Sequence, residues 1–161
     1  MYEEYISDNK IYLPTDNKVM VYNKTTKTFI ENISFTGMFS TMTGTKDDSK
    51  LLICSDLSCS LRRPNGTETI TIPDLMTHVS FYDNNNGFVA SPWPGSLTYK
   101  GKIFYHRFSD NSSGFLQLGS EAGNYSLPRI SPDGQVMIVV INCKLFRYTL
   151  NSGGDWIFDK N

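Results

Sequence analysis

The sequence predicts an all-β, β-propeller-like fold of four blades, each with four antiparallel strands, and three observations carry this prediction. The composition, with ten Phe, nine Tyr and 13% aromatic residues, is typical of half-buried strands. Short apolar segments alternate with turns rich in Asp, Asn and Gly. One order of strands and turns also recurs four times. The 161 residues are expected to form a single domain with blades at about 1–33, 34–75, 76–121 and 122–161.

The clearest repeat spans residues 125–158. Its turn, Ser131-Pro132-Asp133-Gly134, precedes an apolar strand at 135–141, and further strands are expected at 143–149 and 155–158. Proline presets φ at the first turn position and glycine accepts a positive φ at the end. This repeat therefore predicts a tight hairpin inside a blade.

The other three repeats show the same order. In the first repeat the expected strands are 5–6, 11–13, 18–22 and 27–30. The second repeat begins near Met38, and its expected strands are 51–54, 58–62 and 69–72. In the third repeat they are 79–82, 88–90, 103–108 and 115–118. Equivalent turn residues Asp8, Asp48, Asn85 and Asp133 are 40, 37 and 48 residues apart. A period near 40 is typical of a propeller blade, and an insertion at 91–100 accounts for the long third interval.

The Ser131-Pro132-Asp133-Gly134 turn, in its strand context, resembles the WD40-like and TolB-like propeller families. The resemblance implies that this turn joins the first two strands of a blade. The chain departs from WD40 repeats because it has no Gly-His pair and no Trp-Asp dipeptide at a strand end. A β-sandwich or an irregular antiparallel barrel, which also uses short strands and frequent turns, stays open as the alternative.

Charge and hydropathy exclude several classes of partner. Fifteen basic and sixteen acidic side chains leave a net charge of −1, so nucleic acid is not expected as a ligand. No apolar run approaches the roughly 20 residues that cross a bilayer, and the first residues do not resemble a signal peptide. A cytoplasmic location without membrane contact is expected. An extracellular or virion-surface location is the alternative, and it would allow glycosylation at five sequons: Asn23, Asn32, Asn65, Asn111 and Asn124.

Cysteine and histidine do not predict a metal site or a cofactor. Cys54, Cys59 and Cys143 are an odd number of thiols in a chain expected to be cytoplasmic, so reduced, buried cysteines are expected and a disulfide is not. The gap between Cys54 and Cys59 is longer than that of zinc knuckles. His78 and His106 are isolated imidazoles in the sequence, with no carboxylate or cysteine at ligand spacing.

No linear motif indicates catalysis. The chain has no Gly-x-Ser-x-Gly elbow and no phosphate-binding loop. Its acidic turn residues occupy positions where turn geometry already favours Asp: Asp8, Asp47, Asp48, Asp83 and Asp133. The protein is therefore not expected to be an enzyme.

The insertion at 91–100 is the leading candidate for a binding surface. It holds Trp93, Pro94, Leu97 and Tyr99, and Trp and Tyr anchor interfaces while proline lowers the cost of ordering a loop. The competing interpretation is that Trp93 folds back to plug a central channel or to cover a sheet edge.

Arg62 and Arg63 form a weaker candidate site. The expected function is a non-catalytic protein–protein interaction module, a scaffold subunit or an inhibitor, that binds through propeller loops. A glycan- or receptor-binding surface protein, viral or phage in origin, is the alternative. The expected partner is another protein, and a homodimer that completes a larger ring is a further possibility.

Overall fold

The computed structural model describes residues 4–93, 95–96, 98–99, 101–118, 128–141 and 144–159. Within these ranges the chain forms strands and turns and no helix. The strands make four separate four-stranded sheets in which neighbours follow chain order, and all the pairings described are antiparallel. The all-β, four-blade prediction is confirmed, and the sandwich and barrel alternatives are set aside.

The chain divides into two compact units, Met1–Met76 and Thr77–Asn161. Unit 1 contains the sheets β1–β4 and β5–β8, and unit 2 contains the sheets β9–β12 and β13–β16. Each unit is described by itself below. The single-domain expectation stays a prediction.

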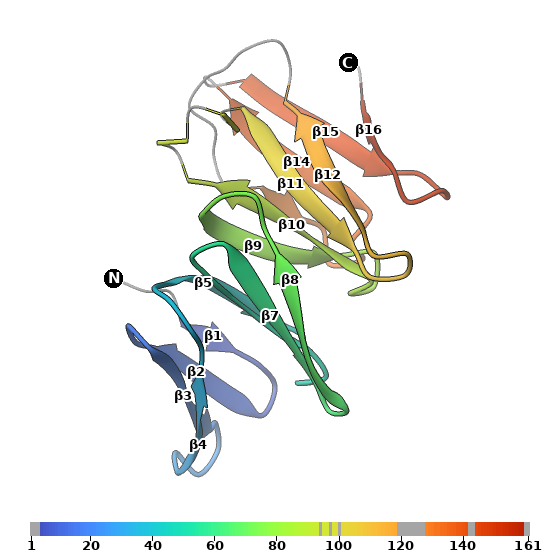
Figure 1. Cartoon of the computed structure of the whole chain (residues 1–161). Helices are drawn as coiled ribbons and strands as arrows, with labels where there is room; N and C mark the ends of the chain where they lie inside the picture. The colour runs from blue at the N-terminus through green and yellow to red at the C-terminus, as the bar shows by residue number, and fades with distance from the viewer. Residues whose placement is uncertain are drawn as a thin grey trace. The chain divides into compact units, whose positions relative to one another are not determined.

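Unit 1 is built from two consecutive four-stranded meanders (Figure 1). The strands are β1 (Tyr5–Ile6), β2 (Lys10–Pro14), β3 (Lys18–Asn23), β4 (Phe29–Ser34), β5 (Phe39–Gly44), β6 (Leu51–Ser55), β7 (Ser58–Arg63) and β8 (Gly66–Thr71). The prediction misplaced the start of β4 at residue 27. The backbone N–H groups of Thr25 and Thr26 donate to Asn23 Oδ1 at 2.9 and 2.8 Å, and Lys27 has φ 59°, so residues 24–28 form the turn.

Alternation along the strands of unit 1 creates its core. Successive side chains of a strand point to opposite faces, and one face of β1–β4 packs against β5–β8. The buried residues of this core are Tyr12, Val19, Val21 and Ile33 from the first sheet and Phe39, Leu51 and Ile53 from the second. Burial of these apolar side chains is what joins the two sheets.

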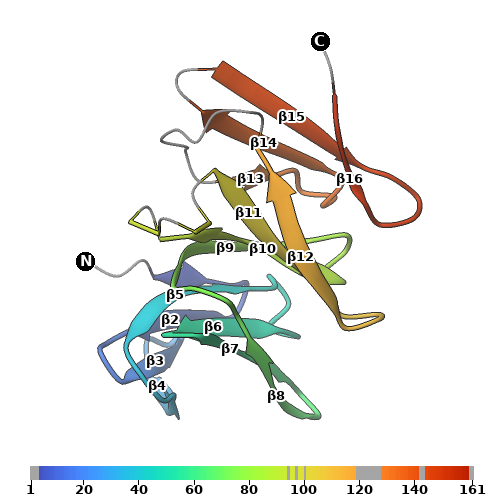
Figure 2. The same ribbon diagram turned by 45° about the horizontal axis from the view of Figure 1, so that its top comes forward.

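Unit 2 repeats the arrangement (Figure 2). Its strands are β9 (Met76–Tyr82), β10 (Gly87–Pro92), β11 (Lys102–Arg107), β12 (Ser112–Gln117), β13 (Arg129–Ile130), β14 (Val136–Ile141), β15 (Lys144–Leu150) and β16 (Trp156–Phe158). Its core joins Val89 and Ile103 to Met137, Val139 and Tyr148. The insertion in the third repeat is shorter than expected because Ser91 and Pro92, which the sequence analysis placed in the loop, are the buried last residues of β10.

The turn between β13 and β14 has the predicted form. Gly134 N donates to Ser131 O at 2.8 Å, and Asp133 Oδ1 accepts from Ser131 Oγ and from Gln135 N. Gly134 has φ 73°, and a Cβ there would lie 2.4 Å from Asp83 N. Glycine is therefore required both by the backbone conformation and by the close approach of the turn that follows β9.

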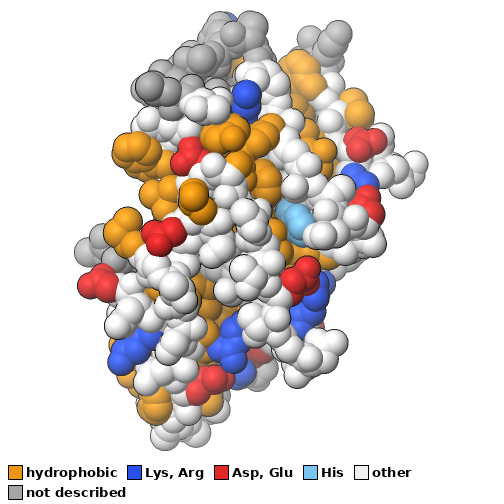
Figure 3. Space-filling view, viewed as in Figure 1, with side chains coloured by type: hydrophobic (Ala, Val, Ile, Leu, Met, Phe, Trp, Pro, Cys, Tyr) orange, Lys and Arg blue, Asp and Glu red, His pale blue; other side chains and the backbone are white. Residues whose placement is uncertain are grey.

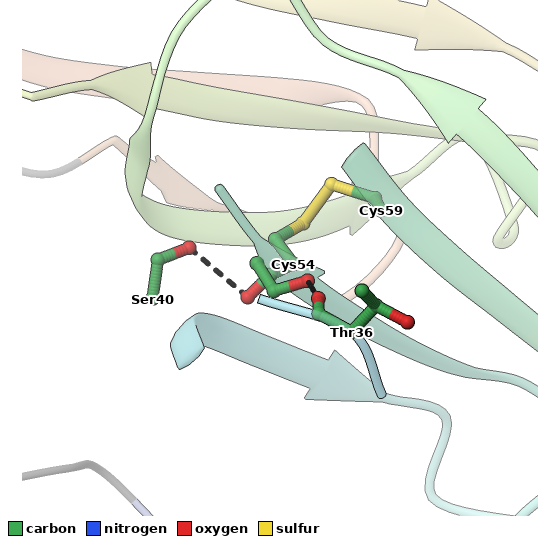
Figure 4. Close-up of a disulfide and its surroundings, with 5 residues drawn as sticks. Thr36, Ser40, Cys54 and Cys59 are labelled. Carbon is green, nitrogen blue, oxygen red and sulfur yellow. Dashed lines mark hydrogen bonds between the residues drawn. A yellow bond between two sulfur atoms is a disulfide. The ribbon is translucent and has the colours of Figure 1, made fainter. Parts of the chain in front are cut away.

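The structure contradicts the expectation of reduced cysteines at two of the three positions. Cys54 and Cys59 form a disulfide between β6 and β7 (Figure 4), and both are fully buried. The count of thiols ignored the register of the hairpin, which places Cys54 directly opposite Cys59. Ser40 Oγ donates to Cys54 O at 3.0 Å, so β5 is bonded to the same position.

Replacement of both Cys54 and Cys59 by Ala is expected to lower the free energy of unfolding by about 2 kcal/mol, because the crosslink no longer restricts the unfolded hairpin. Urea unfolding of the oxidised protein, the variant and the reduced protein measures this difference. The reduced protein keeps both sulfur atoms and is the control for lost packing. Equal stability of oxidised and reduced protein would contradict the prediction.

Candidate functional site

The loop after β10 presents an exposed tryptophan. Trp93 is 51% exposed, and its indole lies over Gly95, where an added Cβ would come within 2.3 Å of the ring. Ser96 N donates to Trp93 O at 2.9 Å, and the side chain of Ser96 is buried. A hydrogen-bonded turn therefore holds Trp93 at the surface, in contrast to the interpretation that it plugs a channel.

Tyr99 fixes the other end of the described loop. Its ring stacks on Phe115 of β12 with centroids 4.5 Å apart and 10° between the planes. Lys102 Nζ lies 5.7 Å from the Tyr99 centroid and 5.8 Å from the Phe115 centroid, which is within the range of cation–π attraction. Since β12 is the last strand of its sheet, Tyr99 is the aromatic residue that packs on a sheet edge.

Two predicted site residues, Pro94 and Leu97, lie outside the described residues, as do Cys143 and the sequon Asn124.

The second candidate surface is a groove in unit 1, between the sheets β1–β4 and β5–β8. A cavity of about 270 Å³ is lined by Lys10, Tyr12, Glu31, Asp48, Arg62 and Arg63, among others. An adjoining cavity of about 320 Å³ shares Glu31, Ile33 and Arg62 with it. Both predicted arginines thus line one groove, whereas Trp93 and Tyr99 belong to unit 2.

Both arginines of the groove are paired with carboxylates. Arg62 Nη2 lies 3.7 Å from Glu31 Oε2 on β4, and Arg63 Nη1 donates to Glu68 Oε2 at 2.8 Å. On the face shown in Figure 3, Lys and Arg side chains lie beside Asp and Glu and form no field of one sign. Exposed pairs of this kind contribute little to stability, but they give the groove a defined pattern of charge.

Tyr12 and Asp48 are functional candidates that the sequence did not reveal. Tyr12 Oη donates to Asp48 Oδ1 at 2.8 Å, although Tyr12 lies in β2 and Asp48 in the distant turn between β5 and β6. Burial, and then the hydrogen bond to Asp48, raise the pKa of Tyr12 above its usual value of 10. Burial, together with the nearby Asp48 charge, raises the pKa of Tyr5 to about 12. Both phenols therefore stay protonated to a higher pH than an ordinary tyrosine does.

The two histidines occupy strands. His78 lies in β9 and His106 in β11, where His106 is buried with its ring centroid 5.5 Å from those of Phe88 and Phe108. The described ranges contain no group of three His, Cys, Asp or Glu side chains suited to a metal ion. Among the same residues, no helix is long and apolar enough to cross a membrane.

Comparison with solved structures identifies the fold. A functionally unknown protein from Desulfotomaculum acetoxidans DSM 771 matches with a TM-score of 0.68 and 14% identity over 99% of this chain and 55% of its own. The C-terminal WD40 domain of Sif2 matches with a TM-score of 0.66 and 18% identity over 96% of this chain and 45% of its own. The predicted resemblance to WD40-like propeller repeats is thus confirmed at the level of the fold.

No protein-family model and no curated protein matches the sequence. The chain spans about half the length of the two solved structures. At these identities the comparisons define the architecture only.

Replacement of Tyr12 by Phe is expected to lower the free energy of unfolding by about 1 to 2 kcal/mol at pH 7, because Asp48 loses a donor in a partly buried position. The pKa of Tyr12 is higher in the folded chain than the usual 10, so its contribution is complete below pH 10 and is lost as the pH rises above 10. Urea unfolding of both proteins at pH 7 and at about pH 11 tests both statements.

Tyr22→Phe is the matched control, because the Tyr22 hydroxyl makes only a long contact, 4.0 Å, to Met20 Sδ. An equal loss of stability in the two variants at pH 7 would mean that the bond to Asp48 contributes nothing specific.

Proposed function

We propose that the chain is a non-catalytic protein–protein interaction module, a scaffold subunit or an inhibitor, that binds its partner through the loop carrying Trp93. The exposed position of Trp93 is the observation that carries the proposal. Tryptophan is the residue type most enriched among residues that dominate binding energy, and an indole with half its surface in water gains apolar contact when a partner covers it.

The anchoring of this loop supports the proposal energetically. Binding costs free energy when loops and side chains must be ordered. The Ser96–Trp93 hydrogen bond and the stack of Tyr99 on Phe115 hold the described part of the loop before any partner arrives. Trp93 can therefore be recognised with a small entropic cost.

The fold and the groove of unit 1 also support a role in protein binding. WD40-like folds commonly mediate protein interactions, and rigid scaffolds with loop-borne sites suit that role. The groove of unit 1 offers Arg62, another residue type enriched in interfaces. Its guanidinium already faces Glu31, so a partner would have to supply a carboxylate in a better geometry.

The disulfide favours a second candidate, a glycan- or receptor-binding protein that acts outside the cell. Disulfides persist in oxidising compartments and are rare in the cytosol. Three of the sequon residues, Asn32, Asn65 and Asn111, are exposed and could carry glycans. Asn23 is less suited, because its side-chain oxygen already accepts two backbone hydrogen bonds.

The redox state of Cys54 and Cys59 in the source separates these candidates. If the second candidate is correct, alkylation of free thiols at the moment of lysis leaves both residues unmodified, and mass spectrometry finds the peptide bridged. Full alkylation of both residues would place the protein in a reducing compartment and remove the second candidate.

Trp93→Ala is expected to weaken partner binding at least tenfold and to leave the free energy of unfolding within about 0.5 kcal/mol, since an exposed anchor contributes to binding and little to folding. A photo-crosslinking amino acid at position 93 first identifies the partner in source cells. Titration of the purified partner with wild type and Trp93→Ala then gives the two affinities.

Leu57 provides the control, because it is an exposed apolar turn residue, 58% accessible, in unit 1. A crosslinker at position 57 should not capture the same partner, and Leu57→Ala should bind as wild type does. The proposal is wrong if Trp93→Ala binds the crosslinked partner with unchanged affinity.

A further inference from the structure

The last sheet of the chain has one apolar face that is exposed. Its other face, with Met137, Val139 and Tyr148, belongs to the core of unit 2. The exposed face, called the trailing face below, consists of Ile138, Val140, Leu145 and Ile157, which are 37%, 37%, 60% and 51% exposed. Strand register confirms that they share one face, since Val140 pairs with Leu145 and the alternation along β14 and β15 is strict.

The first sheet has a corresponding apolar face. Tyr12, Val19, Val21 and Ile33 point into the core of unit 1, so the residues that alternate with them point away from it. This second surface, called the leading face, consists of Ile6, Ile11, Leu13, Met20, Tyr22 and Phe29, as the pairs Ile6–Ile11, Ile11–Tyr22, Leu13–Met20 and Tyr22–Phe29 show. Ile6 is 51% and Phe29 52% exposed, and the other four are half-buried.

The chain itself shows what covers such faces. In unit 2, the face of β9–β12 that carries Val89, Ile103 and Tyr105 is covered by the next sheet, β13–β16. Arg107 of the same face bonds to Gly154 O in the β15–β16 turn at 2.5 Å. The trailing face likewise combines apolar residues with one arginine, Arg147, which pairs with Ile138. It is therefore built like a face that another four-stranded sheet covers.

The size of the related folds indicates how many further sheets such an arrangement can hold. All four sheets of this chain match only 55% and 45% of the two solved structures. In both structures, the part that this chain does not match is therefore about as long as the part that it matches. A second copy of the chain supplies four sheets, which is about that amount.

We propose that two copies of this chain associate head to tail, with the trailing face of each copy packed on the leading face of the other. A contact between two different surfaces closes into a finite ring if the rotation permits, and two copies make two identical contacts. The strands of the trailing sheet total 18 residues and those of the leading sheet 19, so each face covers about 300 Å² at the usual strand spacings. Two faces per copy give about 600 Å², or about 1,200 Å² for the dimer, which is the lower end of the range for stable interfaces.

Native mass is the first test. Sedimentation equilibrium of the chain between about 1 and 50 μM is expected to give twice the 18.2 kDa of one chain. A monomer over the whole range overturns the proposal, because the two faces would then need another occupant. Continued growth beyond two copies overturns the closed dimer.

Charged substitutions test whether both faces take part. Leu145→Glu on the trailing face and Phe29→Glu on the leading face should each weaken dimerisation at least tenfold, since each copy needs both faces. Leu57→Glu introduces the same charge at an equally exposed position outside both faces and should remain dimeric. Circular dichroism and thermal unfolding confirm that each variant is folded.

A crosslink map then distinguishes contact between a trailing and a leading face from contact between two copies of the same face. A photo-crosslinking amino acid at position 145, in a mixture of ¹⁴N- and ¹⁵N-labelled chains, should join mixed-isotope pairs through peptides from residues 5–34. Crosslinks between two trailing faces, or a Phe29→Glu variant that dimerises as wild type does, overturn the head-to-tail arrangement.

Discussion

The structure depends on one constraint, which is that a sheet with two apolar faces needs a covering sheet on each side. In β6 (Leu51–Ser55) and β10 (Gly87–Pro92) every residue is buried, so these strands cannot lie at a surface. Strands buried on both faces are common in parallel sheets, whereas these are antiparallel meanders. Within each unit, face-to-face packing of the two sheets covers one of these faces.

Much of this architecture is legible in the sequence because the strand and turn signals are local. The turn at Ser131-Pro132-Asp133-Gly134 and the period near 40 residues depend on residue types at short spacing, and the structure confirms both. The start of β4 was misplaced because the side chain of Asn23 bonds to the backbone of Thr25 and Thr26 and extends the turn. The Cys54–Cys59 disulfide was missed because it depends on hairpin register, which a count of thiols does not contain.

The candidate site was also predictable only in part. The loop after β10 was predictable because it lengthens one interval of the repeat, and its aromatic residues made it the leading candidate for a binding surface. The distinct roles of Trp93 and Tyr99 were not predictable, since only the fold brings Phe115 to Tyr99. The bond between Tyr12 and Asp48 likewise joins β2 to the distant turn between β5 and β6 and has no local signal. Arg62 and Arg63 gave a local signal, but the groove that they line exists only once both sheets of unit 1 are formed.

The stack of Tyr99 on Phe115 also affects how the chain behaves at high concentration. A last strand such as β12 exposes backbone N–H and C=O groups that can pair with a strand of another molecule and start aggregation. The Tyr99 ring and the Lys102 ammonium group lie over Phe115 of that strand, and a bulky ring with a positive charge hinders the approach of a foreign strand. We expect the residues that hold the loop after β10 in place also to reduce pairing of this edge with a strand of another molecule.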